Sequence, residues 1–128
     1  MSKPKRNAYS KYKAKKVELD GFIFDSKREC ERYKVLKQLV ESGQIHDLRR
    51  QVEYVLIPIQ REPDTVGPKG GIKRGKVIEK ACTYRADFVY KNLDGEEIVE
   101  DTKGFRTSDY IIKRKLMLSV HGIRIREI

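Results

Sequence analysis

The sequence predicts an α/β domain in which a mixed central sheet is flanked by two helices. Its 128 residues are enough for one modest hydrophobic core. Two segments repeat apolar residues at helical spacing next to capping residues, and several others alternate as strands do. The resulting order is a hairpin followed by α-β-β-β-α-β, with the consecutive middle strands antiparallel.

The beginning of the chain is predicted to be a basic arm. Residues 1–16 hold seven Lys and Arg side chains and no acid, out of a formal net charge of +10 for the chain. Because residues 1–13 are also poor in apolar groups, we expect a flexible arm there and a single folded domain over 14–128. Such an arm favours a polyanionic partner, most often nucleic acid, although a solubilising tail has the same composition.

Other features of the sequence indicate the cellular compartment in which the protein is expected. No apolar stretch is long enough to span a membrane, and the N-terminus does not resemble a signal peptide. Cys30 and Cys82 lie in different apolar segments without the spacing of a metal site. They are expected to be buried thiols in a reducing cytoplasm.

The first elements of the domain are predicted to be a hairpin and a helix. The turn Asp20-Gly21 separates the apolar triplets 17–19 and 22–24, which is typical of a type I′ hairpin. Ser26 is the expected N-cap of a helix over 27–41, and Glu29 completes a capping box. The apolar face of this helix carries Cys30, Tyr33, Leu36, Leu39 and Val40, and Gly43 ends it.

Three strands are expected in the middle of the chain, at 50–59, 78–90 and 97–103. Between the first two, residues 61–77 contain four glycines, two prolines and five basic residues. This segment predicts a mobile basic loop or a hairpin extension. A second helix over 108–120, ended by Gly122, and a short strand over 123–128 complete the fold.

The candidate active site rests on three residues, Asp87, Asp101 and Lys103. Acid-x-Lys occurs twice in the chain, about as often as chance predicts, so only its context gives it meaning. The sequence Asp101-Thr102-Lys103 ends an apolar strand, and alternation places Asp101 and Lys103 on the same face as Val99. The alternative for Asp101 is a surface acid paired with Arg85, with Lys103 simply solvated.

The register of the strand pair decides whether the two carboxylates meet. A three-residue loop, Leu93-Asp94-Gly95, places Asp87 opposite Asp101, about 5 Å apart at Cβ. A two-residue turn at Asp94-Gly95 instead places Asp87 opposite Thr102. The sequence permits both, and a left-handed Gly95 favours the first.

These motifs resemble the core of PD-(D/E)XK nucleases, which have a restriction-endonuclease-like fold. The resemblance is carried by Tyr84-Arg85-Ala86-Asp87-Phe88 and Glu100-Asp101-Thr102-Lys103-Gly104, with Ala86 where the motif name has Pro. It implies that Asp87 and Asp101 bind Mg²⁺, for which Mn²⁺ substitutes, and that Lys103 assists catalysis. Phe24-Asp25-Ser26-Lys27-Arg28-Glu29 resembles the preceding helix of small phage and transposon nucleases, which makes Glu29 a further catalytic acid and metal ligand. Lys11-Tyr12-Lys13-Ala14-Lys15-Lys16 is similar to a small phage-encoded family without an assigned function.

Further residues are candidates for contacts with DNA. Gln51 is a candidate for positioning water or phosphate, and an ordinary edge-strand glutamine is the alternative. The basic candidates for phosphate binding lie in the arm, in the 61–77 segment and on the second helix: Lys11, Lys13, Lys15, Lys16, Lys69, Lys73, Arg74, Lys76, Lys113 and Arg114.

The expected function is therefore that of a Mg²⁺-dependent DNA endonuclease. The size, the basic arm and the phage resemblance favour a homodimeric enzyme that cuts branched DNA in phage recombination or replication, as a Holliday-junction resolvase does. The alternative is a DNA- or RNA-binding accessory protein without catalytic activity, and a protein–protein adaptor is a third, less favoured interpretation.

Overall fold

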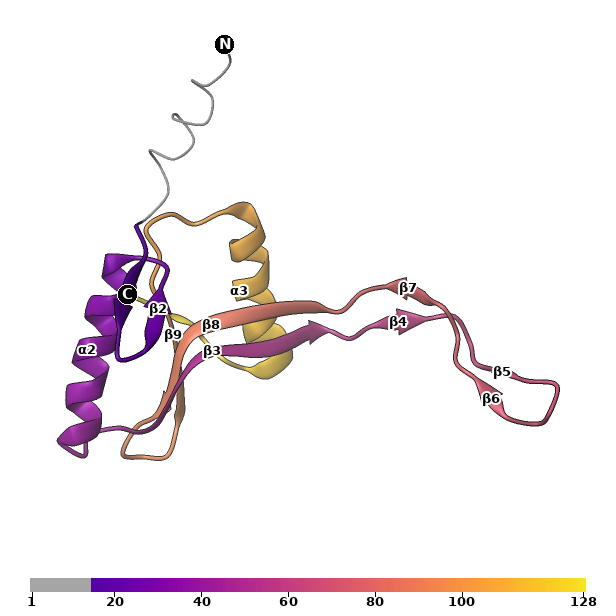
Figure 1. Cartoon of the computed structure of the whole chain (residues 1–128), viewed down its shortest axis with the longest axis horizontal. Coiled ribbons are helices and arrows are strands. Elements are labelled where there is room, and N and C mark those ends of the chain that lie inside the picture. The colour runs from indigo at the N-terminus through magenta and orange to yellow at the C-terminus, as the bar shows by residue number, and fades with distance from the viewer. Residues whose placement is uncertain (1–14) are drawn as a thin grey trace, which may run out of the picture.

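The computed structural model describes residues 15–128 and contains a four-stranded sheet flanked by two helices (Figure 1). The strands lie in the order β10-β9-β8-β3, with β8 antiparallel to both neighbours and β10 parallel to β9. The predicted mixed α/β fold is thus confirmed. The sheet strands are β3 (His46–Ile57), β8 (Cys82–Lys91), β9 (Glu97–Asp101) and β10 (Arg126–Glu127).

The predicted hairpin and first helix have the bounds that the sequence indicates. β1 (Val17–Leu19) and β2 (Phe22–Phe24) pair around Asp20 and Gly21, which both have positive φ, as a type I′ turn requires. α2 (Lys27–Glu41) begins after Ser26, whose hydroxyl accepts a hydrogen bond of 3.1 Å from the Glu29 N–H. The Glu29 carboxylate accepts in turn from the Asp25 N–H at 3.3 Å, one residue earlier than a capping box requires.

The edge strand β3 starts and ends earlier than the predicted range 50–59. Its first residues, from His46 onward, are too polar to suggest a strand, yet they pair with the end of β8. The strand ends at Ile57 because Pro58 has no N–H to donate.

The C-terminal strand is also shorter than the predicted range 123–128. α3 (Ser108–His121) has Thr107 as its N-cap and ends at Gly122, whose φ is +69°. The Ile123 N–H donates to the Met117 carbonyl and so closes the helix instead of starting a strand. None of the helices in residues 15–128 is long and apolar enough to cross a membrane.

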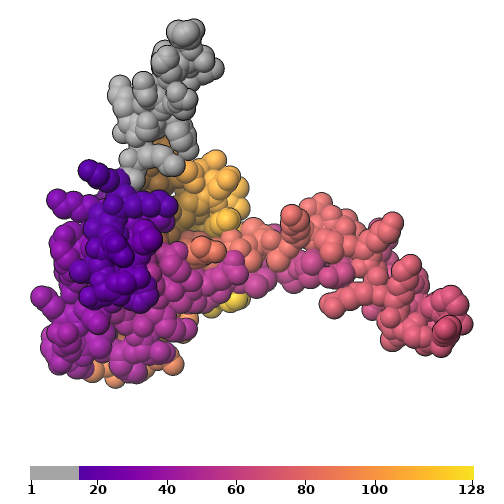
Figure 2. Space-filling view, viewed as in Figure 1, coloured from indigo at the N-terminus to yellow at the C-terminus, as the bar shows by residue number. Residues whose placement is uncertain are grey.

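Residues 61–77 belong to a hairpin extension, one of the two structures that the sequence allows. β4 (Gln60–Arg61) pairs with β7 (Val77–Glu79), and β5 (Thr65–Val66) pairs with β6 (Ile72–Lys73). The extension prolongs β3 and β8 well beyond the helices (Figures 1 and 2). The two strands of the extension approach each other so closely at Gly75 that a Cβ there would lie 1.8 Å from the Glu62 carbonyl oxygen.

The two helices cover different parts of the sheet, and each has its own core. The core beside α3 consists of Leu56, Tyr84, Ala86, Val89, Val99, Tyr110, Met117 and Ile125. The core beside α2 consists of Phe24, Cys30, Tyr33, Leu36, Ile45, Phe88 and Tyr90. Both cysteines are unbridged, but only Cys30 is buried, whereas Cys82 is half-buried.

The strand pair β3–β8 changes face at one position. On β3, Leu48 packs against the α2 core, whereas Val52 and Tyr54 pack against the α3 core, although regular alternation would place all three on one face. On β8, Ala86 and Phe88 differ in the same way. The residue between is Gln51 on β3, which has a φ of +53°. Because β3 bends at this left-handed residue, the side chains before it face α2, whereas those after it face α3.

Candidate functional site

Asp87 and Asp101 lie opposite each other on the two central strands. β8 and β9 pair Phe88 with Glu100 and Val89 with Val99, and the continuation of this register places the two aspartates, which line one cleft, opposite each other. The loop that fixes this register is the three-residue one, since the Asn92 N–H donates to the Glu96 carbonyl and Gly95 has a φ of +82°. The predicted register is thus confirmed.

The same row of the sheet continues on both sides of the two aspartates. β3 pairs Arg50 with Phe88 and Val52 with Ala86, which places Gln51 opposite Asp87. On the other side, β10 pairs Glu127 with Asp101. The four strands therefore present Gln51, Asp87, Asp101 and Glu127 side by side at the bend.

The Asp101 side chain is buried, with an exposed fraction of 3%. Its Oδ2 accepts a hydrogen bond of 2.6 Å from the Tyr84 hydroxyl, and its Oδ1 lies 3.5 Å from the Lys103 Nζ. Burial raises the pKa of Asp101 to about 7, and repulsion by Asp87 adds to the increase, while Tyr84 and Lys103 oppose it. The interpretation of Asp101 as a surface acid paired with Arg85 is therefore wrong.

Asp87 is held against the end of β9 by Thr102. The Thr102 N–H and its hydroxyl both donate to Asp87 Oδ2, each at 2.8 Å. Both of these hydrogen bonds end on Oδ2, so Thr102 does not use Oδ1 of Asp87. Thr102, the middle residue of the acid-x-Lys motif, thus orients the carboxylate of the opposite strand.

Glu29 is both a helix cap and a neighbour of the two aspartates. It is 2% exposed, and its Oε2 accepts a hydrogen bond of 3.1 Å from the Gln51 side chain. Burial raises the pKa of Glu29, and the charge of Asp87 raises it further. The structure therefore brings Glu29 and Gln51 to the Asp87 end of the site, although both carboxylate oxygens of Glu29 already accept hydrogen bonds.

Asp87 and Asp101 line a cleft of about 290 Å³ between β8, β9 and α3. Lys103 reaches over the Tyr110 ring there, with its Nζ 4.4 Å from the ring centroid. Lys113, a candidate for phosphate binding, also lines the cleft. Arg114 does not line it, because its guanidinium forms an ion pair of 3.0 Å with Glu127.

The other basic candidates lie elsewhere. Lys69, Lys73, Arg74 and Lys76 are in the hairpin extension, which Figure 1 shows pointing away from the two helices. Lys15 and Lys16 are exposed just before β1. Lys11 and Lys13, together with most of the basic arm, lie outside the described residues.

Several residues that shape the site were not identified from the sequence. Tyr84 and Thr102 hold the two aspartates, but nothing in the sequence distinguishes them from other strand residues. Glu100 is fully buried beside Asp101 in sequence and forms a two-pronged ion pair with Arg32, at 2.6 and 2.8 Å. This ion pair anchors the end of β9 to α2. The only signal in the sequence that could have pointed to Glu100 is its position directly before the acid-x-Lys motif.

The chemistry of the donor set fits Mg²⁺. Residues 15–128 contain no group of three His, Cys, Asp or Glu side chains close enough together to hold a metal ion. Mg²⁺, however, keeps several waters and is commonly held by one or two carboxylates together with substrate phosphates. A pair of adjacent carboxylates, one of them buried and with a raised pKa, is an arrangement that a divalent cation would stabilise.

The comparisons with known proteins identify one family. No curated protein and no solved structure matches the chain. A family model described as "Protein of unknown function (DUF1064)" matches residues 9–125. These residues include both helices and every strand of the four-stranded sheet except β10. Because this match covers most of the sequence, the chain belongs to the DUF1064 family.

Proposed function

We propose that this protein is a Mg²⁺-dependent endodeoxyribonuclease of the PD-(D/E)XK type. One observation carries the proposal: Asp87 and Asp101 lie opposite each other on adjacent strands, and Lys103 follows on the same face in the same cleft. Two unrelated surface acids would not be expected to meet at the bend of a sheet with one of them buried.

Each residue has a distinct proposed role. Asp87 and Asp101 would hold the cation, while Thr102 and Tyr84 fix the orientation of their carboxylates. Bound Mg²⁺ would supply a water of lowered pKa and neutralise charge on the scissile phosphate. Lys103, whose ammonium lies over the Tyr110 ring, would position the attacking water or neutralise the phosphate.

Glu29 and Gln51 would support this centre from the α2 side. Their hydrogen bond and the proximity of Glu29 to Asp87 make Glu29 a candidate third ligand. Gln51 would position water or phosphate beside it. Lys113, on the α3 side of the cleft, would contact a phosphate next to the cleaved one.

The proposed substrate is branched DNA, cut by a homodimer during phage recombination or replication in the bacterial cytoplasm. Support comes from the charge of the chain and from the shape of the hairpin extension. Lys69, Lys73, Arg74 and Lys76 place four positive charges on a narrow ribbon, and a two-stranded ribbon fits the major groove of DNA. A four-way junction has two-fold symmetry, which a homodimer matches.

The second candidate function is nucleic-acid binding without catalysis. The observation that favours it is that all three carboxylates of the site form internal bonds: Asp87 with Thr102, Asp101 with Tyr84 and Lys103, and Glu29 with Asp25 and Gln51. Such a protein would bind DNA equally well with or without a divalent cation.

Cleavage of labelled junction, flap, duplex and single-stranded DNA in Mg²⁺ and in EDTA tests the proposal. We expect cleavage in Mg²⁺ or Mn²⁺ alone, with a preference for branched substrates. Asp87→Asn, Asp101→Asn and Lys103→Met should each lower the rate by at least about a hundredfold. Asp109→Asn is the matched control, because Asp109 is an aspartate that lines the same cleft from the first turn of α3 and is not on the strands that carry Asp87 and Asp101. Cleavage in excess EDTA, or full activity of Asp87→Asn, would rule the proposal out.

A further inference from the structure

Arg50 carries a guanidinium that is mostly buried and yet poorly compensated. Its side chain is 15% exposed, and its guanidinium carbon lies 4.8 Å from the Phe22 ring centroid and 4.2 Å from that of Phe24. Within residues 15–128 it donates no hydrogen bond, and its Nε is buried without a partner. The nearest carboxylate, Glu29, is 3.6 Å from Nη2, which is too far for a hydrogen bond.

A buried guanidinium without hydrogen bonds is unusual, because desolvating it is unfavourable unless its N–H groups find acceptors. The stacking on two aromatic rings fixes the plane of Arg50 but uses none of its donors. The side chain is therefore oriented, and its charge is paired with Glu29 only through a long contact of 3.6 Å, while its buried Nε–H has no acceptor.

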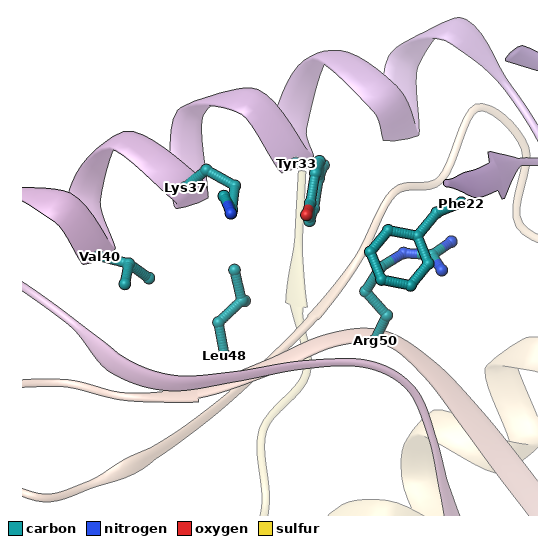
Figure 3. Close-up of a pocket in the computed structure, with 6 residues that line it drawn as sticks. All are labelled: Phe22, Tyr33, Lys37, Val40, Leu48 and Arg50. Atoms are coloured by element: carbon teal, nitrogen blue, oxygen red, sulfur yellow. The ribbon is translucent and has the colours of Figure 1, made fainter. Parts of the chain in front are cut away.

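The space next to Arg50 is a cavity of about 420 Å³ between β2, α2 and β3. It is lined by Phe22, Tyr33, Lys37, Val40, Leu48 and Arg50. Figure 3 shows the Lys37 ammonium and the Tyr33 hydroxyl pointing from α2 into this space, with Leu48 rising from the strand on the other side. Neither polar group forms a hydrogen bond or an ion pair with another described residue.

The composition of the wall indicates the ligand. Two cations and no acid line the cavity, which favours an anion as its ligand. The remaining wall is aromatic and aliphatic, which suits the flat face of a base. The volume lies near the lower end of the range of about 300–1,000 Å³ for small-molecule sites, so it accommodates one small ligand.

We infer that this cavity binds a single unpaired nucleotide, with its phosphate on Arg50 and Lys37 and its base against the exposed Phe22 ring and Leu48. Arg50 also lies beside Glu29 and directly precedes Gln51, which connects the cavity to the aspartate site. The source of the nucleotide, an unpaired strand of the DNA substrate, rests on the proposed function. The nucleotide chemistry itself does not.

Titration calorimetry with dTMP in metal-free buffer with EDTA tests the nucleotide chemistry. We expect the intact chain to bind dTMP with a dissociation constant near 1 mM, and thymidine and inorganic phosphate about tenfold more weakly. Lys37→Ala should weaken dTMP binding about tenfold, because it removes a charged hydrogen bond. Lys34→Ala is the matched control, since Lys34 is on the same helix but exposed and paired with Glu31. No binding up to about 10 mM dTMP, or equal affinity in Lys37→Ala and the intact chain, would overturn the inference.

A second measurement separates DNA from a free nucleotide as the source. Fluorescence anisotropy in EDTA compares a blunt duplex with the same duplex carrying a single-stranded extension. Lys37→Ala should weaken binding of the extended duplex about fivefold to tenfold and leave the blunt duplex unchanged. Equal losses on both substrates would overturn the assignment to an unpaired strand. Neither measurement involves cleavage, so a protein without nuclease activity that still binds dTMP through Lys37 would refute the proposed function and leave this site standing.

Discussion

The Asp101 carboxylate is expected to destabilise the metal-free fold at alkaline pH. Its pKa is about 7 in the folded protein, compared with an ordinary aspartate pKa of 3.8. The folded state therefore retains a proton that the unfolded chain has lost, and stability decreases as the pH rises from about 4 to about 7. The full shift corresponds to an upper limit of about 4 kcal/mol at pH 8.

Asp101→Asn removes the charge and keeps the shape of the side chain. The variant loses the ion pair with Lys103, so we expect a net stabilisation of about 1–2 kcal/mol at pH 8 and no gain at pH 5. For a chain of this length that is a rise in melting temperature of roughly 3–10 °C. Circular-dichroism melting of both proteins in EDTA across this pH range measures the difference.

Mg²⁺ provides the second half of the same test. At pH 8 the cation should stabilise the intact protein by about 1.4 kcal/mol if its concentration is ten times the dissociation constant, and it should stabilise Asp101→Asn much less. Asp109→Asn serves as the control, because its effect should be below about 1 kcal/mol and independent of Mg²⁺. If Asp101→Asn is less stable than the parent by the same amount at pH 5 and pH 8, the carboxylate is not destabilising and the reasoning fails.

Three further predictions concern other parts of the chain. The pKa of Glu127 is lowered to about 2, chiefly by the hydrogen bond that its carboxylate accepts from Arg106. Glu127→Gln should therefore lower the free energy of unfolding by about 1 kcal/mol at pH 7. Urea unfolding should show this difference disappearing as the pH falls from 4.5 to about 2. In the same assay, Ser26→Ala should lower the free energy of unfolding by about 0.5–2 kcal/mol without changing the cleavage rate. Glu29→Gln should lower both the stability and the cleavage rate. If Glu29→Gln cleaves as fast as the parent protein, Glu29 acts only as a helix cap. Deletion of residues 1–13 should lower the slope of log affinity against log salt by about three to four, and unchanged slopes would show that the arm does not contact phosphate.

The fold and the pairing of the two aspartates could be predicted from the sequence because local signals set them. The turn at Asp20-Gly21, the cap at Ser26 and the αL glycine at Gly95 act within a few residues, and each is found where the sequence indicates it. The register of β8 and β9 then follows from the loop length alone.

The surroundings of the aspartates could not be predicted, because they depend on a departure from regular strand geometry. Regular alternation places Arg50 and Val52 on one face, but the left-handed Gln51 turns them to opposite faces. Without this bend, the cavity beside Arg50 and the contact between Gln51 and Glu29 would not exist. The roles of Tyr84 and Thr102 are equally non-local, since each acts across strands on a residue 15 to 17 positions away.

The most direct test of the central claim is the location of a bound cation. A crystal grown with Mn²⁺ at pH 8, with diffraction data collected at the manganese absorption edge, gives the metal position independently of any activity. We predict one anomalous peak between the carboxylates of Asp87 and Asp101, on the side of the cleft that Lys103 and Lys113 line. The same crystal of Asp87→Asn should lack it. If no peak lies between the two aspartates at a saturating concentration of Mn²⁺, or if the metal binds elsewhere, the proposed metal site is wrong.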